Sequence, residues 1–356
     1  MDTIVIGGGQ SGLAATWTLL DAGLTPVLLE AGDQATGSWP RYYDSLTLFS
    51  PARYSSLPGM VFPGHPDRYP HRDEVVDYLA RYARALARRG AGIRTGTRVT
   101  AVEADSGRFN VRTSNGDMFS APTVIAASGS FTNPYLFTLP GQQDFPGEIL
   151  HAAGYDNPAS YAGRRIVVVG AGNSAVQISY ELAETATVTL ATREPVRFVD
   201  QRPLGKDLHF WFHVTGFDRF PARLIDSPPG VPVLDTGIYR QALRDGRMDR
   251  RPMFTRFEGD ELVWADGTRE LVDVVLFATG YRPSLSYLDK IGALDETGHP
   301  RHARGLSTTH AGLGYLGLEW QRTPSSNTLR GVGRDARHLT RELKAHLDTR
   351  RTRAGV

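Results

Sequence analysis

Two glycine-rich stretches of this chain each follow an apolar run: Ile4–Gly12 reads IVIGGGQSG, and Val167–Ala175 reads VVVGAGNSA. In such a loop the first glycine permits a tight turn, the second lets the backbone approach a pyrophosphate, and the third lets the next helix pack closely. The phosphate lies at the helix N-terminus, whose free N–H groups favour an anion. Each stretch therefore predicts a dinucleotide site, formed by Gly7, Gly9, Gln10, Ser11 and Gly12 in the first and by Gly170, Gly172, Asn173, Ser174 and Ala175 in the second.

The residue eighteen positions after each loop distinguishes the two sites. Glu30 stands eighteen positions after Gly12, and Arg193 stands eighteen positions after Ala175. A carboxylate accepts hydrogen bonds from a ribose 2′-hydroxyl, whereas a guanidinium suits a 2′-phosphate. The first site is thus expected to hold FAD or NAD and the second NADP, with pairing of Arg193 to Glu194 as the alternative role for that arginine. A flavin and a nicotinamide can exchange a hydride, so FAD in the first site and NADPH in the second form a working pair.

Both loops lie within a strand–helix–strand pattern. The first unit has strands over 2–6 and 25–30 around a helix over 10–22, and the second repeats the pattern from Arg165, with a helix over 173–184 and a strand over 187–193. Two further apolar strands end in turns at Ser128–Gly129 and Thr279–Gly280. This organisation predicts an α/β fold with two Rossmann-like dinucleotide-binding domains.

Other segments are assigned from their patterning. An amphipathic helix is expected over 72–89, and alternating strands over 98–103, 108–113 and 117–120 are expected to form a small antiparallel meander. Segment 37–71 is rich in proline, glycine, tyrosine and serine and is expected to be a long irregular insertion. Segment 197–232 is expected to be a polar and aromatic insertion with several prolines. A C-terminal helix over 334–346 is expected to be followed by a disordered tail, RTRAGV.

Composition excludes several classes of function. The chain of 356 residues has no cysteine, which removes disulfide redox chemistry, thiolate metal sites and a cysteine nucleophile. The net charge of +2 gives no general attraction to nucleic acid or to an anionic membrane. No leader, membrane span, metal cluster or catalytic triad is evident, so a cytoplasmic protein without a metal is expected.

The segment Phe145–Tyr155, FPGEILHAAGY, matches the pattern FxGxxxHxxxY and thereby resembles the flavin-containing monooxygenases. GSW at 37–39 and FATGY at 277–281 resemble further motifs of that family, and LFSPARYSSLPG at 48–59 is similar to small bacterial members named after cation-efflux neighbours. The resemblance covers the whole chain. It implies a glutathione-reductase-type FAD/NAD(P) fold, with residues 1–140 and 286–356 binding FAD and residues 150–285 binding NAD(P).

The resemblance also implies site residues. Phe49 and Ser50, together with Trp320 and Gln321, are expected near the flavin, although Phe49 stands where many relatives have an asparagine that positions ligand and oxygen. For Trp320, simple core packing is an equal alternative. His151 is expected to join the domains rather than to transfer a proton. Further residues expected to contact a cofactor are Ser38, Trp39, Val99, Ser128, Gly129, Thr279, Gly280, Asn327 and Leu329.

The expected activity is an NADPH-consuming monooxygenase that forms a C4a-hydroperoxyflavin with O2 and oxygenates a small soft nucleophile, a thioether or amine, or a ketone. A disulfide reductase shares the double-dinucleotide plan but is excluded by the absence of cysteine. An NAD(P)H oxidase that releases hydrogen peroxide stays open, as does a flavin-binding redox sensor without turnover. Substrate and O2 are the expected partners, and a homodimer stays an open option.

Overall fold

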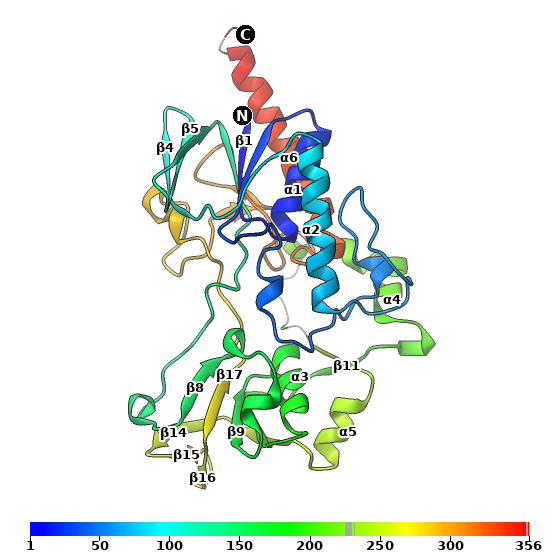
Figure 1. Ribbon diagram of the computed structural model, residues 1–356, viewed down its shortest axis with the longest axis vertical. Coiled ribbons are helices and arrows are strands. Elements are labelled where there is room, and N and C mark those ends of the chain that lie inside the picture. The colour runs from blue at the N-terminus through cyan, green and yellow to red at the C-terminus, as the bar shows by residue number, and fades with distance from the viewer. Residues whose placement is uncertain (225–229, 231, 354, 356) are drawn as a thin grey trace.

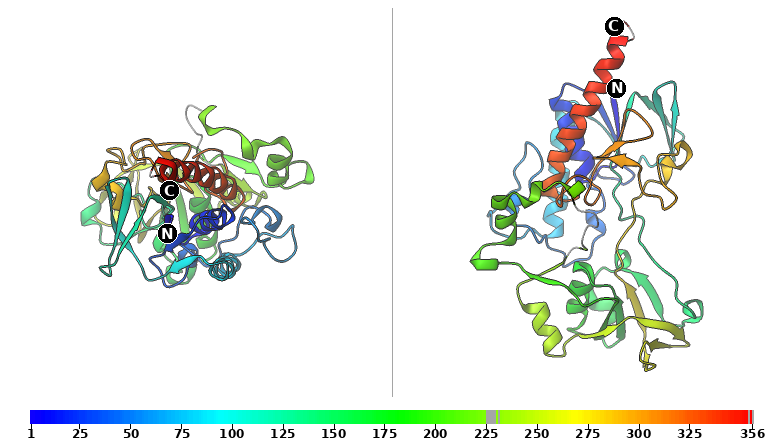
Figure 2. Two further views of the ribbon diagram at one scale, coloured as in Figure 1. Left: turned by 90° about the horizontal axis from the view of Figure 1, so that it is seen from above. Right: turned by 180° about the vertical axis from the view of Figure 1, so that it is seen from behind.

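The computed structural model describes residues 1–224, 230, 232–353 and 355. It consists of two lobes stacked along the long axis, each built on a mainly parallel sheet (Figure 1). The first lobe contains both chain termini, and the second lobe is formed by the middle of the chain (Figures 1 and 2). The chain therefore leaves the first lobe and later returns to complete it.

The first lobe is organised around a seven-stranded sheet. Its centre is apolar, since every residue of β1 (Thr3–Ile6) and β7 (Thr123–Ala126) is buried. β1 pairs in parallel with β2 and β7, and β20 from the C-terminal part extends the parallel set. The remaining strands are β2 (Pro26–Leu29), β3 (Gly92–Arg94), β18 (His302–Ala303), β19 (Leu306–Ser307) and β20 (Leu313–Tyr315).

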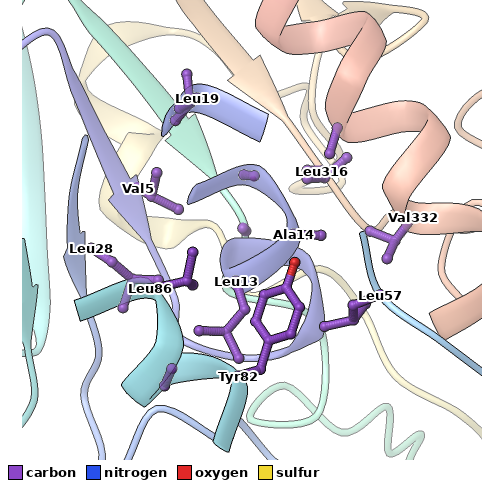
Figure 3. Packing of buried hydrophobic residues seen from close by; sticks show 14 of the residues in the cluster. Val5, Leu13, Ala14, Leu19, Leu28, Leu57, Tyr82, Leu86, Leu316 and Val332 are labelled. Atoms are coloured by element: carbon purple, nitrogen blue, oxygen red, sulfur yellow. The ribbon is translucent and has the colours of Figure 1, made fainter. Parts of the chain in front are cut away.

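Three helices cover one face of this sheet: α1 (Gln10–Asp21), α2 (Arg72–Arg88) and α6 (Leu329–Arg353). Figure 3 shows Leu13 of α1 beside Tyr82 of α2, and Ala14 of α1 on the side that faces Val332 of α6. The stripe Val75, Leu79, Tyr82 and Leu86 on α2 is fully buried, which confirms the amphipathic helix predicted there.

The second lobe repeats the plan with a five-stranded parallel sheet ordered β13-β10-β9-β17-β8. β9 is followed by the second glycine loop, α3 and β10, so both sequence repeats form the predicted strand–helix–strand units. The strands are β8 (Glu148–His151), β9 (Arg165–Val169), β10 (Thr187–Thr192), β13 (Asp249–Pro252) and β17 (Val274–Phe277), and the helices are α3 (Asn173–Leu182) and α5 (Ile238–Arg244).

Each lobe also carries a three-stranded antiparallel meander. β4 (Val99–Asp105), β5 (Arg108–Thr113) and β6 (Met118–Ala121) form the predicted one. The second, β14 (Phe254–Glu258), β15 (Glu261–Trp264) and β16 (Arg269–Leu271), was not predicted. A register shift between Phe254 and Arg256 buries both Phe254 and Phe257, which breaks the simple alternation that marks a strand.

The two chain crossings between the lobes run side by side (Figure 2). Tyr135 N–H donates to the Gly280 carbonyl, Arg282 N–H to Asn133, and Ser284 N–H to Gly129, each at 2.9 Å. Segments 129–135 and 280–284 thus form a paired hinge.

The insertion over 197–232 contains regular secondary structure. Residues 198–224, called the strap here, contain β11 (Phe198–Asp200) and α4 (Leu208–Thr215), and β11 pairs with β12 (Val233–Asp235). The strap crosses to the first lobe, where the buried carboxylate of Asp218 lies 2.9 Å from Arg330 Nε of α6. Tertiary contacts therefore order this proline-rich segment; residues 225–229 and 231 lie outside the described part.

The C-terminal expectation was wrong at both ends. The final helix begins at Leu329 and continues to Arg353, so Arg351–Arg353 are helical rather than a disordered tail. Leu343 and Leu347 are buried against the first lobe, and Arg351 Nη2 forms an ion pair with Asp2 Oδ1 at 2.9 Å. These contacts hold the last turns against the core, while Ala354 and Val356 lie outside the described residues.

Candidate functional site

A cavity of about 1310 Å³ lies at the carboxyl ends of β1, β2 and β7 and reaches the hinge. This volume exceeds the range usual for small-ligand pockets, so it suits a long ligand. Most residues that the sequence assigns to the first site line it: Gly7, Gly9, Gln10, Ser11, Glu30, Ser38, Trp39, Phe49, Ser50, Val99, Ser128, Gly129, Gly280, Asn327 and Leu329.

The first glycine loop brings the backbone close to this cavity. Gly7 has a φ of 105°, and an added Cβ would lie 2.5 Å from the Ala127 carbonyl oxygen. Gly12 does not line the cavity; an added Cβ there would lie 1.8 Å from the Gly7 carbonyl oxygen, as expected of the glycine that permits close helix packing.

The N-terminus of α1 has no side-chain cap and no acidic residue in its first turn. In contrast, α2 is closed by a capping box of His71 and Glu74, and α4 is capped by the Asp207 side chain. Uncapped N–H groups at a helix start are available to an anion. The difference indicates that α1 is kept open for a ligand phosphate.

Glu30 lies immediately after β2 and is buried, with both carboxylate oxygens engaged by backbone. Oε2 accepts from Gly8 N–H at 2.5 Å, and Oε1 accepts from Gly32 N–H at 2.7 Å. A carboxylate has room for further donors on both oxygens. Glu30 is therefore held in place at the cavity wall with acceptor capacity left for ribose hydroxyls.

The cavity wall also carries an unused polar atom. Gln10 Nε2 donates to the Asn327 carbonyl at 2.7 Å, whereas its buried Oε1 has no hydrogen-bond partner among the described residues. A buried unpaired acceptor is costly, and a bound ligand with a donor would satisfy it. The glycine cradle, Glu30 and this acceptor together fit the flavin dinucleotide that the sequence predicts.

The second glycine loop has the same open design. Gly170 has a φ of 144° and approaches the Ala278 carbonyl, whereas an added Cβ at Gly172 would contact nothing within 4 Å. Gly172 begins α3 without a side-chain cap, and α3 has no acidic residue in its first turn. Asn173 turns instead to Pro232 and Leu234, with its Nδ2 donating at 3.2 Å and its Oδ1 accepting at 3.3 Å. The N-terminus of α3 thus suits a second phosphate group.

Arg193 directly follows β10, the position that Glu30 occupies after β2. Its side chain is exposed and forms no ion pair within the described ranges, and the alternative pairing with Glu194 is not found there. The guanidinium is thus free to meet a phosphate.

The remaining residues predicted for the cofactor sites lie near the second loop and the hinge. Ser174 and Ala175 lie in the first turn of α3, and Thr279 Oγ1 donates to the Tyr135 carbonyl beside the hinge.

Residues 4–211 match the family described as pyridine nucleotide-disulphide oxidoreductase. A solved flavin-containing monooxygenase from Stenotrophomonas maltophilia is 32% identical to this chain and superposes on it with a TM-score of 0.85. The match covers 97% of this chain and 98% of the monooxygenase. The chain belongs to the flavin-containing monooxygenases. It is thus a flavin monooxygenase-type oxidoreductase, which confirms the enzyme class and the pairing of a flavin with a nicotinamide nucleotide.

Other relatives agree with membership of this monooxygenase family. The oxidoreductase CzcO-like of Geobacillus kaustophilus is 32% identical over 97% of this chain and 99% of its own. Indole-3-pyruvate monooxygenase YUCCA1 of Oryza sativa subsp. japonica is 29% identical over 82% of this chain and 79% of its own. A bacillithiol disulfide reductase from Bacillus cereus shares the fold, with a TM-score of 0.73 at 22% identity. This monooxygenase has no cysteine for such disulfide chemistry.

The family signature runs along β8, an edge strand of the second lobe, and its C-terminal end lies at the contact with the first lobe. An added Cβ at Gly147 would lie 2.5 Å from Phe145 Cζ, so the glycine is required by the packing of the phenylalanine. Tyr155 is fully buried, with its ring 6.2 Å from that of Tyr43 in the first lobe. His151 is buried and its pKa is lowered by burial, which favours the neutral ring. These contacts support a joining role for the signature.

Trp320 and Gln321 do not line the cavity of this monooxygenase. Trp320 has a φ of 52°, and the tight turn lets Gln321 Nε2 donate to the Tyr315 carbonyl at 2.7 Å while Gln321 Oε1 accepts from Leu318 N–H at 3.2 Å. Gln321 is therefore occupied in holding the turn, and its predicted place beside the flavin is not supported by the cavity.

Several lining residues were missed by sequence reasoning. Phe131 stacks on Tyr281 at 5.3 Å and meets Tyr42 edge-on at 4.6 Å, which gives the hinge end of the cavity an aromatic wall. Tyr287, His302 and Arg330 also line the cavity. The aromatic residues just after the ASG and ATG turns, Phe131 and Tyr281, were the available signal.

In the described ranges, no helix is both long enough and apolar enough to cross a membrane.

Proposed function

We propose that this chain is an FAD-dependent, NADPH-consuming monooxygenase that oxygenates a small molecule with O2. The observation that carries the proposal is the pair of uncapped glycine-loop helices, one followed by the carboxylate of Glu30 and the other by the exposed guanidinium of Arg193, which has no ion-pair partner among the described residues. Opposite charges at equivalent positions favour a ribose in the first lobe and a 2′-phosphate in the second. Residues 1–140 and 286–356 are the proposed FAD-binding part, and residues 150–285 the NAD(P)-binding part.

A flavin bound beside Glu30 and the first glycine loop would supply the redox chemistry, which takes a hydride from NADPH and passes an oxygen atom from O2 to the substrate. The protein binds, orients and excludes water. Glu30 and the first loop fix the dinucleotide, and the wall of Tyr42, Phe131 and Tyr281 shields the hinge end of the cavity from solvent. The aromatic wall at the hinge end of this otherwise mixed polar and apolar lining suits a small soft nucleophile, a thioether or an amine, with a ketone as the other proposed class.

The test is a two-step reaction of the purified FAD-loaded protein. NADPH is added without oxygen, and loss of the oxidised flavin absorbance measures reduction. Oxygen is then mixed in, with and without a thioether, while the flavin spectrum and hydrogen peroxide are followed. A transient peroxyflavin spectrum and sulfoxide in proportion to NADPH are expected. Immediate peroxide with no transient would overturn oxygenation in favour of an NAD(P)H oxidase.

A second candidate, the NAD(P)H oxidase, is favoured by Phe49. The side chain is 37% exposed and lines the cavity. The resemblance to the family implies an asparagine at this position in its animal and yeast members. A phenyl ring cannot donate a hydrogen bond to an oxygen adduct, so the adduct would be held less well. The peroxide yield in the same experiment separates the two functions. Absence of any NADPH consumption in air would instead favour a redox sensor.

A further inference from the structure

A further contact between the lobes lies apart from the hinge and reaches the cavity wall. Gln201, just after β11 in the strap, is buried with 6% of its side chain exposed. Its Nε2 atom donates to the Phe49 carbonyl at 3.0 Å and to Asp207 Oδ2 at 2.8 Å. Phe49 belongs to the first lobe and lines the cavity, so one amide group joins the strap to that wall.

The backbone of Gln201 is itself fixed. Its N–H donates to the Asp235 carbonyl at 2.9 Å, and its carbonyl accepts from Leu208 N–H at 2.9 Å. The side chain thus projects from an anchored point, because the strap on either side of it is tied to β12 and to the start of α4.

Asp207 fixes the amide orientation. Its carboxylate accepts from Tyr69 Oη at 2.5 Å and from both His209 N–H and His209 Nδ1 at 2.8 Å, in addition to Gln201. Burial raises the pKa of Asp207, but the hydrogen bonds from His209, Tyr69 and Gln201 outweigh it and leave the pKa lowered, so the group is charged. A flipped Gln201 amide would point its oxygen at two acceptors. Only the donating orientation is compatible with this site.

The first lobe does not hold the Phe49 carbonyl by itself. Leu48 N–H donates to Pro70 at 2.8 Å, and Ala52 N–H donates to Arg68 at 2.9 Å, on either side of Phe49. Between these two bonds, the described residues offer the Phe49 carbonyl no hydrogen-bond donor other than Gln201. The orientation of the peptide after Phe49 therefore depends on a residue that lies 152 positions away in the sequence.

We propose that Gln201 is a positioning residue for the substrate side of the cavity, acting through the Phe49 carbonyl, and that Asp207 orients Gln201. The expected effect on substrate turnover rests on the proposed monooxygenase function, whereas the expected effect on amide hydrogen exchange does not. Tyr54 supports the same attachment from the first lobe, since its ring stacks on His209 with centroids 6.5 Å apart. Because Gln201 belongs to the lobe that carries the second glycine loop, the wall at Phe49 is built by both lobes.

The structural test is amide hydrogen exchange of the FAD-loaded protein, without NADPH or substrate. Gln201→Leu removes both N–H donors at similar volume. The matched control is Gln143→Leu, because Gln143 is exposed and its side-chain amide donates to no described residue except its neighbour Asp144. Exchange over 47–55 is expected to be several-fold faster in Gln201→Leu and unchanged in Gln143→Leu, while α1 and β9 stay protected in both. Unchanged exchange over 47–55 would overturn the proposal.

The functional arm measures turnover of a thioether. Gln201→Leu is expected to raise the KM for the thioether about fivefold, the factor for one lost hydrogen bond, and to raise the peroxide fraction. Anaerobic flavin reduction by NADPH should stay within about twofold of the wild type. Faster exchange with unchanged KM and peroxide fraction would overturn the positioning role. Failure of the wild type to oxygenate any thioether would defeat the substrate class instead, and the exchange result would still decide the link to Phe49.

The milder variant Asp207→Asn serves if Gln201→Leu does not bind FAD. It keeps the shape of the side chain but replaces one acceptor oxygen by an NH2 group, so it weakens the hold on Gln201. The same direction of change in exchange and KM is expected, and its absence would count equally against the proposal.

Discussion

His151 Nε2 lies 3.0 Å from the carbonyl oxygen of Gly280, which also accepts the Tyr135 N–H at 2.9 Å. The other ring nitrogen, Nδ1, accepts from Ala153 N–H at 3.0 Å. The neutral ring thus donates from Nε2 and accepts at Nδ1. The signature histidine is thus bound to the crossing at Gly280, whose carbonyl also holds Tyr135 of the other crossing, and both of its ring nitrogens are engaged by backbone groups.

Replacing His151 is expected to lower the stability of the protein more than the rate of its reaction. His151→Ala removes two buried hydrogen bonds and should lower the melting temperature of the FAD-loaded protein by about 2–5 °C. The rate of anaerobic flavin reduction should keep the same pH profile as the wild type. Loss of one limb of that profile in His151→Ala would assign the histidine a proton-transfer role and contradict the structural assignment.

Gly172→Ala tests the second phosphate site without disturbing the fold. The added Cβ contacts no atom within 4 Å, and the φ of −90° suits alanine, so the melting temperature should change by less than about 1 °C. The same methyl group lies where a pyrophosphate would approach the backbone, so the KM for NADPH should rise about tenfold or more. Gly154→Ala, also in open space, is the control, and an equal rise in KM there would remove the argument.

Arg193→Ala tests the choice of coenzyme. Loss of a charge-assisted bond to a 2′-phosphate should raise the KM for NADPH about 10- to 100-fold, while the KM for NADH changes by less than about threefold. Steady-state kinetics with both coenzymes measure this ratio. Glu194→Gln should leave both values unchanged. An equal loss for NADPH and NADH in Arg193→Ala would mean that the guanidinium does not meet the phosphate.

His338 on α6 predicts an acid-side loss of stability. Its side chain is buried, and burial together with the charges of Arg322 and Arg304 lowers its pKa to about 4. Arg341 and the opposing Glu342 are its other charged neighbours. The unfolded chain binds the proton of this histidine more readily than the folded chain does. The contribution of the neutral ring to the free energy of unfolding is therefore fully present above about pH 6.5 and is lost as the pH drops toward 4.

The size of this loss is expected to be on the order of 2 kcal/mol. Thermal unfolding of the wild type and of His338→Gln at pH 7 and pH 4.5 measures it, since glutamine does not titrate. The stability gap between the two pH values should be smaller in His338→Gln. An identical gap would show that another group is responsible for the acid sensitivity.

The local elements of this fold could be predicted from the sequence because each depends on residues that are close to one another in the sequence. The two strand–helix–strand units and α2 follow from apolar periodicity, and the FAD-side loop residues follow from glycine spacing. Glu30 was found because a strand end fixes its place relative to the loop. The sequence therefore predicted the part of the site that lies within a single strand–helix–strand unit of about thirty residues.

The rest depends on contacts between distant segments. The final helix extends past its predicted end because Arg351 meets Asp2, and the strap is ordered because Asp218 meets Arg330. Gln201 gave no signal in the sequence, since its importance arises from a carbonyl at Phe49. Trp320 and Gln321 were assigned from a motif, but a turn with positive φ directs Gln321 to the backbone.

The adjacent crossings at 129–135 and 280–284 mean that the middle of the chain enters and leaves at a single place. A segment with neighbouring ends can be exchanged as one cassette, because a graft needs only one junction to match. Coenzyme preference in such proteins is thus open to recombination of whole modules as well as to point substitution. The strap sets the limit on such exchange, since a transplanted module must also rebuild its contacts with the recipient.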